Sequence, residues 1–166
     1  MIVVADTSPL NYLVLLEQAG LLRALYGRVI VPEAVVRELQ AQGSPERVRQ
    51  WIAARPDWLE VRSSVVPEDP ALAMLDPGER EAIALAENLR ADAIILDERN
   101  GRREAERRGL RVIGTIRVLD DAAIAGLVDL PGLLNRLQTL GFYLDPALRD
   151  FLLARHAERE RRKTGE

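Results

Sequence analysis

Two aspartates each follow directly on a short apolar run. Asp6 ends the run at residues 2–5, and Asp97 ends the run at residues 93–96 in the stretch AIILDERNG. Each run has the length and composition of a buried strand. Functional groups of a parallel α/β sheet gather at the carboxyl ends of its strands. Because the two strands are expected to be neighbours in the sheet centre, the two carboxylates are predicted to share a cation site.

Asp6 also has a structural interpretation, as the N-cap of the helix that follows, because aspartate is a favoured capping residue. Ser8 suits that position better, since Pro9 would then occupy the first helical position, where proline is common. This reasoning predicts a helix over residues 9–18 and leaves Asp6 free for a functional role.

Two glutamates on predicted helices can add carboxylates to the same site. Glu38 follows Pro32 and lies on the flank of the helix face formed by Val35 and Leu39. It is either an ion-pair partner of an arginine or a ligand that points into a cleft, and the sequence leaves both interpretations open.

In the stretch DPGEREAIALAENL, helical spacing puts Glu79 on the core-facing stripe with Ala82 and Ile83, whereas Glu81 faces outward. An alternative is that Asp76 and Glu79 form a capping box at the start of this helix, which would explain both residues without a function. Glu79 is nevertheless the stronger candidate for an acid that points inward.

Four converging carboxylates would repel one another unless cations were bound. The chain has no cysteine and a single histidine, so its hard oxygen ligands favour Mg²⁺ or Mn²⁺ over zinc. Two such ions about 3.5–4 Å apart are a common device for phosphodiester hydrolysis, in which one activates a water and the other stabilises the leaving oxygen.

Two other classes of protein also place an aspartate at a strand end: the haloacid-dehalogenase phosphatases and the response-regulator receivers. Both use a lysine near that aspartate, and the only lysine here is Lys163, in the charged C-terminal segment. The phosphatase pattern also requires an acid at position 8, which is Ser8. These classes are therefore strongly disfavoured.

The alternation of predicted elements gives the fold class. Strands are expected at 2–5, 28–31, 59–62, 93–96 and 111–113, and helices at 9–18, 33–42, 45–54, 76–90, 101–108, 115–125, 130–140 and 146–162. This βα rhythm predicts an α/β protein, a three-layer α/β/α sandwich with a central, mostly parallel sheet. We expect one domain over residues 1–166, with a core at about 1–128 and C-terminal helices at about 130–162.

Charge and composition limit the partners and the compartment. The net charge of −3 provides no global attraction to nucleic acid, so RNA binding would need local patches. Arginines cluster over residues 99–111, and Arg99 and Arg102, nearest the predicted site, are the preferred RNA contacts. The alternative is a solvated helix face balanced by Glu104 and Glu106. No apolar run approaches the roughly 20 residues of a membrane helix, so we expect a cytoplasmic protein with no membrane partner.

Several stretches carry a family resemblance: VVADTSPLNYLVLL, VIVPEAVVRELQ, LDPGEREAIALAENLRADAIILDERNGRREAERRGLRVIGT and VLDDAAIAGLV. Together they cover most of residues 2–128, and they resemble the DUF3368 branch of the PIN-domain superfamily, which is similar to the ribonuclease toxins of toxin–antitoxin pairs. The resemblance implies a compact α/β/α sandwich and a metal-dependent endoribonuclease.

The resemblance also implies roles for individual residues. The first acid of the family falls on Asp6, followed by supporting hydroxyl positions at Thr7 and Ser8. The second and fourth acids fall on Glu38 and Asp97. The third, commonly an aspartate, falls on Glu79, although Glu81 and Glu98 are near enough to the acidic positions to confuse this assignment. This departure from the commonest pattern bears on catalytic competence.

The partners implied are an RNA substrate, a small antitoxin protein encoded alongside, and a second copy of the chain. The competing interpretation is a non-catalytic PIN-like module that binds RNA or a protein partner. All four acidic positions remain acidic, which favours the enzyme.

Overall fold

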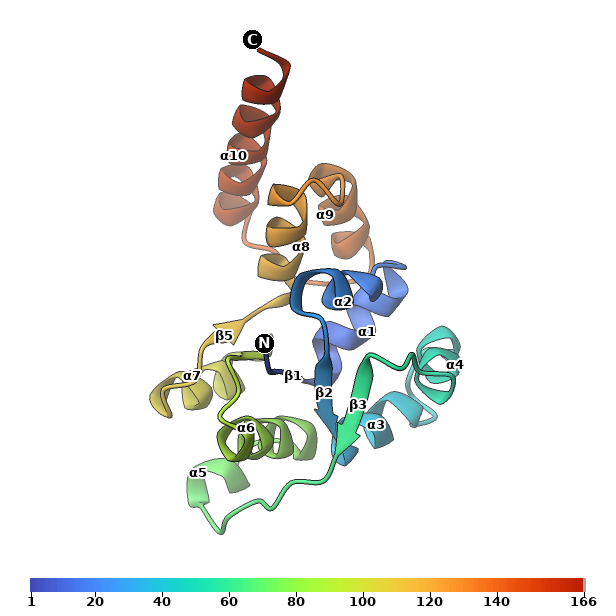
Figure 1. Cartoon of the computed structure of the whole chain (residues 1–166), viewed down its shortest axis with the longest axis vertical. Helices are drawn as coiled ribbons and strands as arrows, with labels where there is room; N and C mark the ends of the chain where they lie inside the picture. Colours follow the sequence, from blue (N-terminus) through green and yellow to red (C-terminus); the bar gives the residue numbers. More distant parts are fainter. Residues whose placement is uncertain (166) are drawn as a thin grey trace. The chain divides into compact units, whose positions relative to one another are not determined.

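The computed structural model describes residues 1–165, and its centre is one parallel sheet (Figure 1). The strands are β1 (Val3–Ala5), β2 (Val29–Pro32), β3 (Leu59–Arg62), β4 (Ala93–Ile95) and β5 (Val112–Ile113), in the order β3-β2-β1-β4-β5. Every neighbouring pair is parallel. The chain builds outward from β1 to β3 and then returns to add β4 and β5 on the other side. The strand order therefore reverses between β1 and β4.

Helices flank this sheet and confirm the predicted α/β/α class. In the part of the chain that contains the sheet they are α1 (Thr7–Leu15), α2 (Gly20–Tyr26), α3 (Glu33–Gln40), α4 (Glu46–Ala53), α5 (Pro70–Ala73), α6 (Pro77–Leu89) and α7 (Arg99–Arg107). The chain continues with α8 (Thr115–Ile124), α9 (Leu130–Thr139) and α10 (Pro146–Thr164). In Figure 1, α3 and α4 lie to the right of β2 and β3, and α6 lies to their left.

Two short helices, α2 and α5, were not predicted from the sequence. α2 follows α1 after only a few residues, so no long turn in the sequence marks where one helix ends and the next begins. α5 lies between the strand predicted at 59–62 and the helix predicted at 76–90, where no element was predicted from the sequence. Its signal was local: the Asp69 side chain accepts a hydrogen bond of 2.9 Å from the Ala71 N–H, and Pro70 occupies the first helical position.

The main core lies between α6 and the sheet. Val4, Ile30 and Ile94 of the three central strands are buried against Ile83 and Leu85 of α6. α6 contacts β1, β2 and β4, so its packing fixes its first turn relative to the carboxyl ends of these strands. Burial of each such side chain contributes about 1.5–3 kcal/mol.

The chain divides into two compact units, one over Met1–Thr115 and one from Ile116 onward. The first contains the sheet. In the second, Asp120 of α8 is buried and accepts hydrogen bonds from Arg155 and Arg159 of α10, the latter at 3.4 Å. The single domain expected over residues 1–166 stays a prediction. None of the helices in the described part of the chain is long and apolar enough to cross a membrane.

Candidate active site

Asp6 lies where β1 ends and α1 begins, next to β4 at the reversal of strand order. Ligands bind at this kind of position in open α/β sheets. The Asp6 N–H donates to the Ile95 carbonyl at 2.9 Å, so its backbone still belongs to the sheet. α1 then starts at Thr7, and Asp6 takes the N-cap position without a capping bond from its side chain. The predicted start at Pro9 with Ser8 as the cap was therefore wrong.

The Asp6 carboxyl group is buried and partly unsatisfied. Its side chain is 4 % exposed, and Oδ1 has no hydrogen-bond partner. Burial raises the pKa of Asp6 from 3.8 to about 7; the Thr7 N–H opposes the rise, whereas the charges of Asp76, Glu38 and Asp97 add to it. A buried carboxylate of this kind lacks a compensating positive charge, which a bound cation would supply.

Glu79 lies in the first turn of α6 and is also 4 % exposed. Its backbone N–H donates to Asp76 Oδ1 at 2.9 Å, which confirms the capping half of the predicted box. Burial, together with the charges of Asp76 and Asp6, raises the pKa of Glu79 to about 8. Glu81 instead accepts a hydrogen bond of 3.2 Å from Arg37. Glu79 is thus the acid that faces inward, as its helical position predicted.

Glu38 is half-buried on α3 and resolves the choice that the sequence left open. Its carboxylate accepts hydrogen bonds from the Thr7 hydroxyl and, at 2.9 Å, from the Gly78 N–H. These partners lie at the starts of α1 and α6, so Glu38 joins three helices near Asp6 instead of pairing with an arginine. The supporting roles of Thr7 and Ser8 stay predictions; both side chains are half-buried.

Asp97 follows β4 by two residues and holds the start of α8. Its Oδ1 accepts from the Thr115 N–H at 2.7 Å, and its Oδ2 accepts from the Thr115 hydroxyl at 2.5 Å. Burial raises the pKa of Asp97, while the two Thr115 bonds and the charge of Arg102 oppose the rise. Both oxygens of this acid therefore already have partners, in contrast to Asp6.

Three of the acids lie against glycine backbone, a feature that the sequence reasoning missed. A Cβ atom added at any of these glycines would crowd a carboxylate, which would then have to shift. The distances from the added Cβ would be 2.5 Å from Gly78 to Glu38 Oε2, 3.2 Å from Gly101 to Glu79 Oε2, and 3.1 Å from Gly114 to Asp97 Oδ1. Each of these glycines lies inside a motif stretch, within a few residues of an acid or of Thr115. This position in the sequence could have indicated the contacts.

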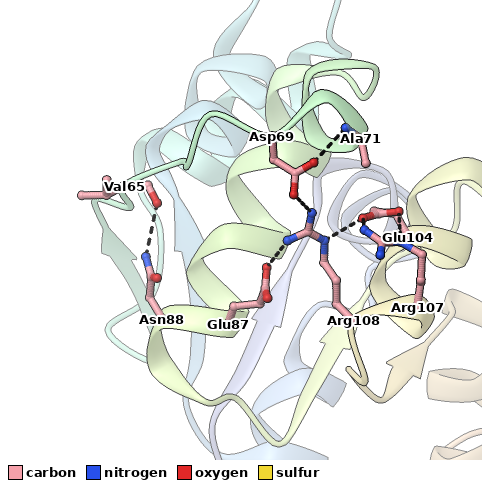
Figure 2. Close-up of polar contacts among 8 residues, drawn as sticks. All are labelled: Val65, Asp69, Ala71, Glu87, Asn88, Glu104, Arg107 and Arg108. Carbon is pink, nitrogen blue, oxygen red and sulfur yellow. Dashed lines mark hydrogen bonds and ion pairs between the residues drawn. The ribbon is translucent and has the colours of Figure 1, made fainter.

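The arginines of residues 99–111 do not form one surface. Arg99 is exposed at the start of α7, and Arg102 is half-buried and donates to the Leu96 carbonyl at 3.0 Å. Arg108 points elsewhere and is only 11 % exposed; it bonds Asp69, Glu87 and Glu104 (Figure 2). Contact of Arg99 and Arg102 with an RNA substrate stays a prediction.

The donor set fits a hard divalent cation held by few protein ligands. Within residues 1–165, no three acidic or histidine side chains lie close enough together to hold one metal ion. Mg²⁺ commonly keeps several waters and is bound through one or two carboxylates plus substrate phosphates. The unpartnered Oδ1 of Asp6 and the buried carboxyl group of Glu79 provide oxygen ligands of this kind.

The parallel sheet, its flanking helices and the acids at its carboxyl edge define a PIN-like α/β/α protein. The family model of DUF3368, a PIN domain, matches residues 2–158, so the chain belongs to this family. A PilT N-terminus domain protein from the hyperthermophilic archaeon Sulfolobus solfataricus P2 has a similar fold, with a TM-score of 0.52, 17 % identity, and coverage of 74 % of this chain and 93 % of that one. No curated protein matches the chain. PIN domains are generally nucleases and typically use divalent metal ions.

Proposed function

We propose that the chain is an endoribonuclease that hydrolyses RNA phosphodiesters with Mg²⁺ or Mn²⁺. The observation that carries the proposal is the buried Oδ1 of Asp6, which has no partner and lies where the strand order reverses. The raised pKa values of Asp6 and Glu79 point the same way, because both groups gain from a nearby cation.

Asp6 and Glu79 would hold the ion, and Glu38 and Asp97 would act on it only through water. When bound, the ion would supply an activated water and stabilise negative charge at the phosphate. Thr7 and Gly78 orient Glu38, and Thr115 orients Asp97. Arg99 and Arg102 lie on the helix after Asp97 and would contact the RNA backbone, because a guanidinium matches phosphate geometry.

The biological role that we propose is the toxin of a toxin–antitoxin pair, with a small antitoxin encoded alongside and a second copy of the chain as a further partner. This part of the proposal rests on the similarity of the motif stretches to ribonuclease toxins. The competing function is a non-catalytic PIN-like module for RNA or protein. It would bind labelled RNA in a gel-shift assay without cleaving it in Mn²⁺.

Glu79→Gln is expected to lower Mn²⁺-dependent RNA cleavage by about 100-fold, because a direct ligand to the ion is lost. Glu81→Gln, two residues along the same helix, provides the matched control and should stay within about threefold of wild type. Single-turnover cleavage of a fluorescent single-stranded RNA pool measures both, with EDTA abolishing the wild-type rate. Equal losses in the two variants, or cleavage that survives EDTA, would contradict the assignment.

A further inference from the structure

Arg102 brings a fixed positive charge to the candidate site. It projects from α7, is half-buried, and its Nη1 donates to the Leu96 carbonyl at 3.0 Å. A Cβ atom added at Gly114 would lie 2.7 Å from Arg102 Nη1 and 3.1 Å from Asp97 Oδ1. The guanidinium and the Asp97 carboxylate therefore both lie against Gly114, and the charge of Arg102 opposes the rise in the pKa of Asp97.

The acids of the site form two groups, which differ in whether a positive charge lies beside them. On one side, Asp97 has an arginine beside it and both of its oxygens accept hydrogen bonds from Thr115. On the other side, Asp6 Oδ1 is buried without a partner, and the charges of Asp76 and Glu38 that act on it are negative. Only the second group lacks a positive charge.

We propose that Arg102 is the built-in cation of this site and takes the place of a second metal ion beside Asp97. The chain then binds one divalent ion, on the side of Asp6 and Glu79, and Asp97 is a positioning residue that holds Arg102 and the start of α8. This inference deepens the proposed nuclease function and rests on it. It specifies that the site binds one ion and that the Arg102 side chain takes the place of a second ion.

The chemistry of arginine suits this role. A guanidinium stays protonated at any working pH, so its charge does not depend on the metal concentration. One of its donors is used on the Leu96 carbonyl, and a guanidinium has five, so others remain for a phosphate oxygen. Gly114 contributes to this arrangement, because a side chain there would crowd the guanidinium beside Asp97.

The test is the number of Mn²⁺ ions bound by the full chain, measured by calorimetric titration and by the electron paramagnetic resonance signal of free Mn²⁺. Wild type should bind one ion per chain. Arg102→Gln should bind two, because Asp97 loses its compensating charge. Arg102→Lys should stay at one, and so should Arg103→Gln, which removes the exposed neighbouring arginine of the same helix. Adding Asp97→Asn to Arg102→Gln should restore a single ion.

Two ions in the wild-type chain would overturn the inference, and so would a folded Arg102→Gln variant that still binds one. Thermal melting of each variant shows whether it is folded; if Arg102→Gln is not, the wild-type count and Arg102→Lys decide. One bound ion in a protein that cleaves no RNA would contradict the proposed nuclease while supporting the assignment of Arg102. No Mn²⁺ binding to wild type would overturn both.

Discussion

Asp6→Asn is expected to abolish metal-dependent cleavage and, at the same time, to stabilise the metal-free protein at pH 8. The pKa of Asp6 is raised from 3.8 to about 7 by burial. Between these values the folded state binds more protons than the unfolded state, so stability falls as the pH rises. Since one pKa unit corresponds to about 1.4 kcal/mol, ionised Asp6 costs the folded protein on the order of 4 kcal/mol above pH 7.

The amide of asparagine must still be buried, so only part of this cost is recovered. A gain of about 2 kcal/mol is expected, which raises the melting temperature by roughly 4–8 °C for a chain of this size. Differential scanning calorimetry without metal should show the gain at pH 8 and the loss of most of it near pH 4. There the unfolded state is also partly protonated, so most of the difference between the two states is lost.

Bound metal should reverse the order of the melting temperatures of wild type and Asp6→Asn. Mn²⁺ that binds only the folded wild type raises its melting temperature with concentration, whereas Asp6→Asn should respond weakly. Asp57→Asn, which removes an exposed aspartate, should differ little from wild type in either condition. If metal-free Asp6→Asn melts below wild type at pH 8, the buried charge is not a burden on the fold. The assignment of the Asp6 carboxylate as a metal ligand would then fail.

The sequence located Asp6 and Asp97 because local patterns determine both positions. Each acid follows a continuous apolar run, and such runs become parallel strands whose carboxyl ends share one edge. Helical spacing likewise separated Glu79 from Glu81, because the same stripe that buries Ala82 and Ile83 passes through Glu79. The fold class followed from the βα alternation for the same reason.

Contacts between distant segments could not be predicted in this way. Thr115 meets Asp97 across eighteen residues, and Gly78 meets Glu38 across forty, and no periodicity links such pairs. The start of α1 was misplaced because the backbone bond from Asp6 to Ile95, which keeps Asp6 in the sheet, is also a long-range contact. Local propensity favoured Pro9 at the first helical turn, and tertiary structure overrode it.

Arg107 and Arg108 show this limit most clearly, because they are adjacent and of the same type. Both bond Glu104, yet Arg107 is 61 % exposed and Arg108 only 11 %. Arg108 also bonds Glu87 of α6 at 2.8 Å and Asp69 at the start of α5, so one guanidinium joins three elements (Figure 2). Burial would lower the pKa of Arg108, but its bonds with Glu104, Asp69 and Glu87 raise it above the usual value.

Arg108→Met is expected to destabilise the protein by about 1–3 kcal/mol, the range for lost hydrogen bonds between charged groups. Methionine keeps much of the side-chain volume, but Asp69, Glu87 and Glu104 lose the guanidinium that they share. Glu104 still has Arg107, and Asp69 still accepts from the Ala71 N–H. α7 carries Arg102 and α6 carries Glu79, and Arg108 fastens these helices together. The loss should therefore also weaken Mn²⁺ binding at a distance from the substitution.

Urea unfolding of Arg108→Met and of Arg107→Met measures the difference between the two positions. Arg107→Met should leave the midpoint nearly unchanged, because an exposed ion pair adds little stability. Lowering the pH to about 4 should shrink the defect of Arg108→Met, since protonation neutralises the carboxylates that lost their partner. Equal effects in the two variants, or a defect in Arg108→Met that persists at low pH, would show that side-chain packing and not charge holds these helices together.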